Sequence, residues 1–181
     1  ADIDDDGDND LLLGTIWLQN GGNGTVWTAR TLFSTSNDPD RNQLADMDGD
    51  GDLDAVVGYE AISANGVLAW YEAPANPTGV WSQHVIDTII GPQSLDVADL
   101  DGDSDLDVVA GEHNKNQPAQ GRVFAFRNDG NSFHRFLVAT GDEHHDGAQL
   151  ADADNDGDLD ILSIGWEHDR VLLYEHIACV V

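Results

Sequence analysis

The chain contains few basic residues and a single cysteine. Its 181 residues include seven Lys and Arg against 35 Asp and Glu, which gives a formal net charge of −28 at pH 7. So few cations are available to meet phosphate groups that we expect neither nucleic acids nor anionic membrane surfaces as partners. The lone Cys179 excludes an internal disulfide framework.

Long apolar runs and a leader segment are also missing. No apolar run approaches the roughly 20 residues of a membrane-spanning helix, so we expect no membrane insertion. No secretory signal is present, and we expect a mature chain or a fragment. Hydrophobic residues make up 40% of the sequence, which excludes a wholly disordered chain and is enough, at this length, for one domain with a core.

What the chain does contain is a nine-residue acidic loop that occurs four times. The copies span 2–10, 46–54, 99–107 and 152–160 and read DIDDDGDND, DMDGDGDLD, DLDGDSDLD and DADNDGDLD. Asp occupies positions 1, 3, 5, 7 and 9 of every copy, so 20 of the 35 acidic residues lie in these loops. Carboxylates crowded into a tight turn repel one another unless a hard cation lies between them. The loops therefore predict up to four Ca²⁺ sites.

The segments around the loops repeat as well. The loops start at 2, 46, 99 and 152, and a period near 50 residues is typical of propeller blades. An alternating segment precedes a loop and an apolar run ending in Gly follows it, as in 94–99 and 108–111. In the first copy only Thr15 separates Gly14 from Ile16, so we expect its second and third strands to run together.

Aromatic residues mark the rest of each repeat. A third segment carries an aromatic residue in register in all four copies, and a fourth segment begins with one in three copies. These residues are Trp17, Trp70, Phe126 and Tyr174, followed by Trp27, Trp81 and Phe133. We predict four short antiparallel strands per repeat, stacked so that the aromatics of the third strand pack between neighbouring sheets. Stacking of these aromatics on sugars is the alternative.

The pattern D-x-D-x-D-G-D-x-D, followed by a buried strand that ends in Gly, resembles the FG-GAP/VCBS repeat family of integrin-like β-propellers. The resemblance covers the whole chain and implies one all-β domain over 1–181, with four-stranded antiparallel blades that begin near 1, 42, 94 and 147. The first and last blades are incomplete. We therefore expect a partial propeller, or half of a ring that closes as a homodimer, in preference to a self-contained four-bladed ring.

The resemblance also assigns the calcium ligands. Positions 1, 3, 5 and 9 supply side-chain carboxylates, and position 7 supplies its backbone carbonyl. The side-chain ligands are Asp2, Asp4, Asp6 and Asp10; Asp46, Asp48, Asp50 and Asp54; Asp99, Asp101, Asp103 and Asp107; and Asp152, Asp154, Asp156 and Asp160, and the carbonyl ligands are Asp8, Asp52, Asp105 and Asp158. Gly at position 6 allows a left-handed backbone. Ser104 stands there in the third loop, where we expect a strained or weaker site.

The loops do not belong to an EF-hand. That motif needs Glu at position 12 and flanking helices, whereas position 12 is Leu13, Val57, Ala110 or Ser163 and the flanks read as strands. Magnesium fits less well than calcium, because it keeps its waters and an octahedral shell. We expect calcium to contribute folding free energy directly. Free calcium is plentiful outside cells, so an extracellular or cell-surface location is expected.

A second group of polar residues recurs on the face opposite the loops, after the second strand of a repeat or before the first. It comprises Glu60, Glu112, His113, His144, His145, Trp166, Glu167 and His168. His and Glu serve as general bases and acids, bind transition metals and hydrogen-bond hydroxyl groups, while Trp stacks on sugar rings. The alternative is that these are ordinary solvated loop residues.

Three functions follow from this pattern. The first is a non-catalytic calcium-binding module that recognises carbohydrate or an extracellular protein through the polar face. The second is part of a polysaccharide lyase or sugar dehydratase, with His145, His168 or Glu167 as catalytic candidates. The third is a purely structural adhesion or scaffold segment. No Ser–His–Asp set, phosphate-cradling Gly loop or Cys–His zinc spacing is visible, so the sequence favours a non-catalytic protein.

Overall fold

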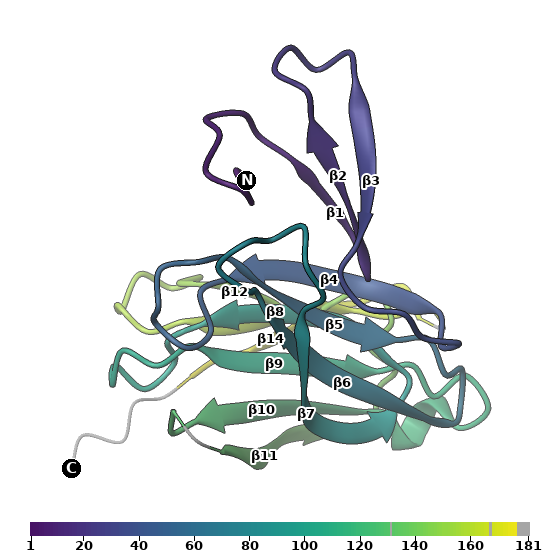
Figure 1. Ribbon diagram of the computed structural model, residues 1–181. Coiled ribbons are helices and arrows are strands. Elements are labelled where there is room, and N and C mark those ends of the chain that lie inside the picture. Colours follow the sequence, from purple (N-terminus) through teal and green to yellow (C-terminus); the bar gives the residue numbers. More distant parts are fainter. Residues whose placement is uncertain (131, 167, 177–181) are drawn as a thin grey trace.

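The computed structural model describes residues 1–130, 132–166 and 168–176, which fold into four antiparallel β-sheets (Figure 1). Sheet 1 contains β1 (Leu11–Leu13), β2 (Ile16–Asn20) and β3 (Trp27–Thr31). Sheet 2 contains β4 (Pro39–Ala45), β5 (Asp54–Tyr59), β6 (Asn65–Glu72) and β7 (Ser82–Ile90). Sheet 3 contains β8 (Pro92–Ala98), β9 (Asp107–Glu112), β10 (Arg122–Asn128) and β11 (Phe133–Thr140). Sheet 4 contains β12 (Gln149–Ala151), β13 (Asp160–Ile164) and β14 (Val171–Tyr174).

Each sheet is a meander in which strands that follow one another in the sequence are hydrogen-bonded neighbours. A short 3₁₀ helix, η1 (Pro118–Gln120), lies between β9 and β10. The all-β class and the antiparallel repeats predicted from the sequence are confirmed. Among the described residues, no helix is long and apolar enough to cross a membrane.

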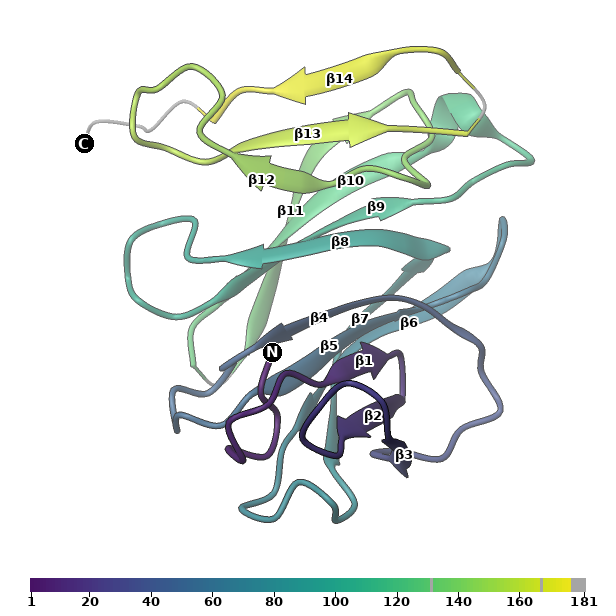
Figure 2. The same cartoon turned by 90° about the horizontal axis from the view of Figure 1, so that it is seen from above.

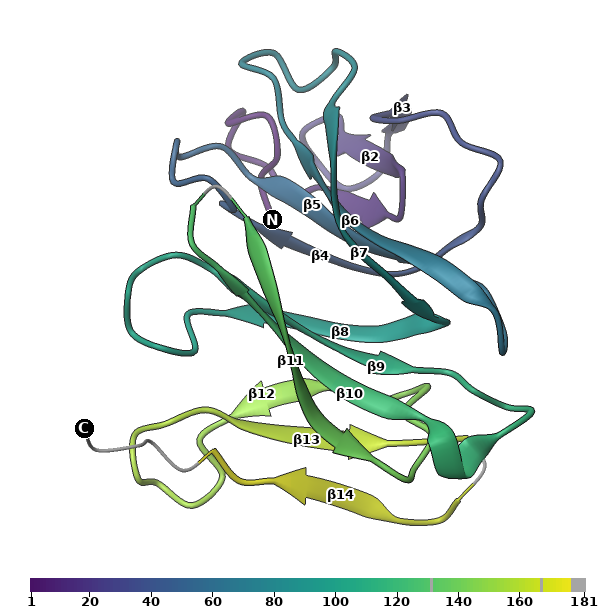
Figure 3. The same cartoon turned by 90° about the horizontal axis from the view of Figure 1, so that it is seen from below.

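The four sheets stack in chain order, and sheets 1 and 4 lie at opposite ends of the stack (Figure 2). Strands β4, β8 and β12 lie side by side on one edge of this stack, and β7 and β11 lie on the other edge (Figure 3). The acidic loops lie at one end of the sheets, where β4 joins β5, β8 joins β9 and β12 joins β13. The connections after β5, β9 and β13 lie at the other end.

The core consists of three apolar layers between consecutive sheets, because the second strand of a repeat is apolar on both faces. In β5, Ala55 and Val57 face sheet 1 and belong to the same cluster as Trp17, while Val56 faces sheet 3. In β9, Val109 packs in the layer toward sheet 4.

The aromatic residues of the third strands lie in these layers. Trp17 and Phe126 are fully buried, and Trp70 and Tyr174 are partly buried against the same clusters. Inter-sheet packing of the four aromatics is therefore confirmed. The layers bury both faces of sheets 2 and 3, which explains why their middle strands read as continuous apolar runs.

The first repeat differs from the expectation that its second and third strands run together. A two-residue turn at Gly14 and Thr15 separates β1 from β2, and Leu13 pairs directly with Ile16. Gly14 has φ +65°, and a Cβ there would lie 2.5 Å from the ring of Pro39. Glycine is required at this turn both for its left-handed backbone and for the close approach of β4.

Candidate functional site

Each acidic loop folds around the carboxylate at position 1. In the second loop, Asp46 Oδ1 accepts the N–H of Gly49 at 2.9 Å and Oδ2 accepts the N–H of Gly51 at 3.1 Å. Asp99 makes the same two bonds in the third loop. Asp2 and Asp152 also accept two loop N–H groups each. The loop geometry is thus fixed by hydrogen bonds within the loop, and it repeats in all four copies.

Two residues of each loop have a left-handed backbone. At position 6 the φ angles are +95° for Gly7, +99° for Gly51, +81° for Ser104 and +100° for Gly157. The left-handed position 6 is therefore confirmed, including at Ser104, where the side chain makes it unfavourable. At position 4 the φ angles are +56° for Asp5, +75° for Gly49, +78° for Gly102 and +64° for Asn155. Position 4 was missed, although Asp, Gly and Asn are the residues that best tolerate this conformation.

The carboxylates at positions 1, 3 and 5 converge in three loops, and those at positions 1, 3 and 9 converge in the third loop. Within each group the ligand atoms lie within 4.8 Å of one another, and the groups are Asp2, Asp4 and Asp6; Asp46, Asp48 and Asp50; Asp99, Asp101 and Asp107; and Asp152, Asp154 and Asp156. One oxygen of Asp4 is buried and has no hydrogen-bond partner within the described chain. A buried carboxylate oxygen without a donor is a place where a cation would bind.

The residue at position 9 joins the loop to its sheet. Asp54 is 1% exposed, and its two oxygens accept the N–H groups of Met47 at 2.9 Å and of Ala73 at 2.8 Å. The first donor is position 2 of the loop, and the second follows the end of β6. Asp10, Asp107 and Asp160 are equally buried and repeat the scheme. Each of these carboxylates therefore fixes the end of the third strand to the loop.

The charge of the loops is costly in the folded chain. Burial raises the pKa of Asp54 to about 7, against the lowering effect of its bonds from Ala73 and Met47. Burial is also the main cause of the raised pKa values of Asp4, Asp48 and Asp107. Neighbouring carboxylates raise all four values further. A divalent cation bound by hard oxygen donors would remove this cost, so the donor set fits calcium.

At the opposite end of the sheets, several of the polar residues come together between sheets 3 and 4. We define this rim cluster as His113, Glu143, His145, Asp146 and Trp166. The ring centroids of His113 and His145 lie 4.4 Å apart. The rings of His145 and Trp166 are arranged edge to face, with their centroids 5.8 Å apart. His113 Nε2 lies 3.9 Å from Glu143 Oε1. His145 Nδ1 lies 2.8 Å from Asp146 Oδ1.

The rim cluster has a buried floor and an exposed indole. His113 is buried, its Nδ1 is hydrogen-bonded to the side chain of Gln93, and burial followed by the nearby His145 lowers its pKa. Glu143 is fully buried, and its Oε2 accepts the N–H of Trp166 at 2.6 Å. The indole of Trp166 is 68% exposed. The floor is therefore buried, polar and hydrogen-bonded, and the tryptophan faces solvent beside it.

A basic residue reaches the cluster from the far side of β8. Arg41, in β4, places one guanidinium nitrogen 3.1 Å from Asp146 Oδ1 and the other 2.8 Å from Asp40 Oδ1. Arg41 and Asp146 lie 105 residues apart in the sequence. Arg41 of sheet 2 thus reaches the connection that precedes β12, and the cluster carries both signs of charge.

Other residues of the predicted polar face lie elsewhere. Glu112 is fully buried and accepts hydrogen bonds from Arg122 Nε at 2.8 Å and from the N–H of Ile90 at 2.9 Å. His144 is fully buried, with Nδ1 2.7 Å from Ser163 Oγ. The structure therefore places Glu112 and His144 inside the fold and not on a surface that a ligand reaches.

Of the remaining predicted residues, His168 contacts the cluster. His168 is half-buried, with Nε2 3.1 Å from the backbone carbonyl of Glu143 and Nδ1 3.3 Å from the N–H of Arg170. It therefore positions the segment that carries Glu143. Glu60 is exposed, and its N–H bonds the carbonyl of Asp38 at 2.8 Å. Glu167 lies outside the described residues, as does Cys179.

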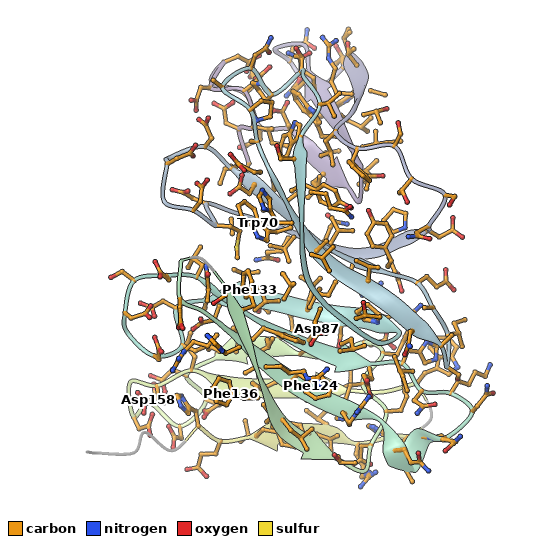
Figure 4. All side chains as sticks on the ribbon, turned by 60° about the horizontal axis from the view of Figure 1, so that its bottom comes forward. Trp70, Asp87, Phe124, Phe133, Phe136 and Asp158 are labelled. Carbon is orange, nitrogen blue, oxygen red and sulfur yellow. The ribbon has the colours of Figure 1, made fainter. Side chains whose placement is uncertain are left out.

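A cleft that the sequence did not indicate opens between sheets 2 and 3. It has a volume of about 770 Å³ and lies beside the second acidic loop. Trp70 lines it with its ring stacked on His84 at 4.3 Å, and His84 Nε2 lies 2.8 Å from Glu72 Oε2. Figure 4 shows Trp70 and Phe133 facing this space from the two sheets. The pairing of Trp70 with His84 across β6 and β7 depends on register, which the sequence alone does not reveal.

No protein-family model matches the chain, and a search of curated proteins finds no match.

Proposed function

We propose that the chain is a calcium-stabilised segment of an FG-GAP/VCBS-type β-propeller that binds carbohydrate through the face opposite its acidic loops. The observation that carries the proposal is the fourfold repetition of one loop, in which the position 1 carboxylate accepts two loop N–H groups and carboxylates converge. The stacking of four meander sheets in chain order supports the propeller assignment.

In this proposal calcium has a structural role. The residues that would hold it are the converging Asp groups at positions 1, 3 and 5, with Asp107 at position 9 in the third loop. The ion supplies the positive charge that lets these carboxylates lie close together. The chain supplies the rest, because the position 1 and position 9 carboxylates already hold the loop and fix it to the sheet. Such sites favour extracellular conditions, where calcium is abundant.

Sugar recognition rests on the rim cluster. Trp166 offers an exposed aromatic surface of the kind that stacks on a pyranose ring, and its backbone is held by Glu143. His145, Asp146 and Arg41 lie around it and offer donors and acceptors for hydroxyl groups. The mixture of charges suits a neutral or weakly charged glycan better than a strongly anionic one.

The test is retention of the chain on polysaccharide resins in calcium. We expect Trp166→Ala to abolish retention while leaving the melting temperature unchanged, because the indole is mostly exposed. Phe136→Ala is the matched control, since Phe136 is an exposed aromatic on β11, away from the rim. Equal retention of all three proteins, or no retention of the wild type on any glycan, would contradict the proposed ligand.

One observation favours a second candidate, an enzyme of the lyase or dehydratase type. His145 lies against Asp146, and a histidine paired with a carboxylate suits a general base that removes a proton next to a carbonyl group. Arg41 stands beside the pair. New ultraviolet absorbance from an unsaturated sugar, lost in His145→Ala, would favour this candidate. A chain that folds with calcium and binds no ligand would favour the structural scaffold.

A further inference from the structure

The two end sheets each leave one apolar face open to solvent. On sheet 1, Leu11, Leu13 and Ile16 are between 40% and 54% exposed. Leu13 pairs with Ile16 across β1 and β2, so these side chains lie on one face. On sheet 4, Ile164, Val171 and Leu173 are between 41% and 72% exposed.

The sheet 4 side chains also share one face. Ile164 pairs with Val171, and Leu162 pairs with Leu173 across β13 and β14. Ile161 and Tyr174, which alternate with them, pack on the opposite side against sheet 3. Sheet 4 therefore has one face in the core and one apolar face in solvent.

Comparison of equivalent residues in the four repeats shows which inter-sheet surface the open face of sheet 1 corresponds to. The residue directly after the position 9 Asp is Leu11, Ala55, Val108 or Ile161. In sheets 2, 3 and 4 this residue is buried in the layer shared with the preceding sheet. In sheet 1 it is Leu11, on the open face. Sheet 1 thus exposes the surface that every other sheet buries against its predecessor.

The next residue along the strand gives the converse result. It is Leu12, Val56, Val109 or Leu162. In sheets 1, 2 and 3 this residue packs in the layer shared with the following sheet. In sheet 4 it is Leu162, which shares the open face with Leu173. Sheet 4 thus exposes the surface that every other sheet buries against its successor.

The two open faces are therefore the two sides of one interface that occurs three times within the chain. We infer that a second copy of this chain docks end to end, with sheet 4 of one copy against sheet 1 of the other. The strands that carry the open faces have no acidic residue apart from Asp160, which is buried. More than half of the acidic residues, 20 of 35, lie in the loops and not on these faces.

The same contact made twice closes a pair of copies. Radially packed sheets form rings of about four to eight blades, and two copies of four sheets give eight, whereas three copies would exceed this range. Each contact joins sheet 4 of one copy to sheet 1 of the other, and a two-fold axis relates the two contacts. Because both open faces of each copy are then covered, the assembly stops at two copies. The inference rests on the packing of the sheets and does not depend on the rim ligand.

Light scattering in saturating calcium, over a range of protein concentrations, tests the inference. The expected mass is twice the 19.5 kDa of one chain. We expect Leu13→Lys and Val171→Lys, one on each open face, both to give monomers. Val80→Lys is the control, because Val80 is 79% exposed in the connection before β7 and belongs to neither open face. Circular dichroism checks that the variants fold, and we expect them to do so because the mutated side chains are exposed.

A mixture of the two variants gives a second readout. Leu13→Lys keeps an intact sheet 4 face and Val171→Lys keeps an intact sheet 1 face, so the mixture regains one good contact and some paired mass. A wild-type monomer at every concentration, an assembly larger than two copies, or a dimer that survives either substitution would overturn the inference. A monomeric Val171→Lys excludes a contact between two sheet 1 faces, because this substitution on sheet 4 would leave such a contact unchanged.

Discussion

The carboxylate of Asp54 bonds the N–H of Ala73, 19 residues later, at 2.8 Å. This bond ties the second acidic loop to the end of β6, and the other oxygen holds Met47 within the loop. The carboxylate therefore stabilises the loop even without a cation, whereas the carboxylates at positions 1, 3 and 5 crowd together there. Substitution at position 9 therefore removes hydrogen bonds to the backbone, whereas substitution at position 3 removes a carboxylate from the converging group.

We predict that Asp54→Ala destabilises the chain both in calcium and in chelator. The substitution leaves two backbone N–H groups buried and unpaired, and each costs about 1–3 kcal/mol. Asp48→Asn is the comparison, because Asp48 belongs to the converging group and its loss should weaken calcium binding and spare the chelated protein. Urea unfolding of both variants with and without calcium measures the difference. Identical profiles for the two variants would contradict separate roles for positions 3 and 9.

Calcium should raise the melting temperature strongly, and magnesium should not replace it. Each site contributes about 2.7 kcal/mol when the free ion is a hundredfold above its Kd. For a chain of this size that corresponds to roughly 5–10 °C per site. Differential scanning calorimetry in calcium, in magnesium and in chelator measures the shift. An unchanged melt in chelator would count against calcium in all four loops.

Ser104→Gly should stabilise the third loop by about 1 kcal/mol, because Ser104 has φ +81°, where a side chain is unfavourable. The reciprocal substitution Gly157→Ser should destabilise the fourth loop by a similar amount. Gly157 has φ +100°, and a Cβ there would meet nothing within 4 Å, so the substitution adds backbone strain alone. Chemical unfolding in calcium checks both signs. Two changes in the same direction would show that strain at position 6 does not decide stability.

The strands and loops could be predicted because their signals are local. The apolar runs after the second and third loops pack on both sides, and each loop is defined by the spacing of Asp. What could not be predicted depends on partners distant in the sequence. The burial of Glu112 follows from its ion pair with Arg122 across β9 and β10. His144 and His145 are adjacent, yet one is buried against Ser163 and the other lines the rim cluster.

The rim cluster shows the same limit of local patterns. The sequence places His113 and His145 at the same end of their repeats, and the structure brings their rings to 4.4 Å. Arg41 joins them only because β4, β8 and β12 lie side by side. Its role depends on the stacking of the sheets, which no single repeat encodes.

The contribution of His144 to stability should fall in mild acid, because His144 is buried in its neutral form. Burial is the main cause that lowers its pKa to about 4, below the ordinary value of 6.5. A histidine whose pKa is lower in the folded state binds its proton first in the unfolded state. The stabilising effect of neutral His144 is therefore fully present above pH 6.5 and is lost as the pH falls from 6.5 toward 4.

The difference between the wild type and His144→Gln isolates this effect from the titration of the carboxylates. Each unit of pKa difference is worth about 1.4 kcal/mol, so the wild type should lose on the order of 2–3 kcal/mol more than the variant between pH 7.5 and pH 4.5. His84→Gln is the control, because the His84 side chain is 43% exposed. Urea unfolding at both pH values measures the differences. Parallel losses in the wild type and in His144→Gln would show that His144 does not govern the acid response.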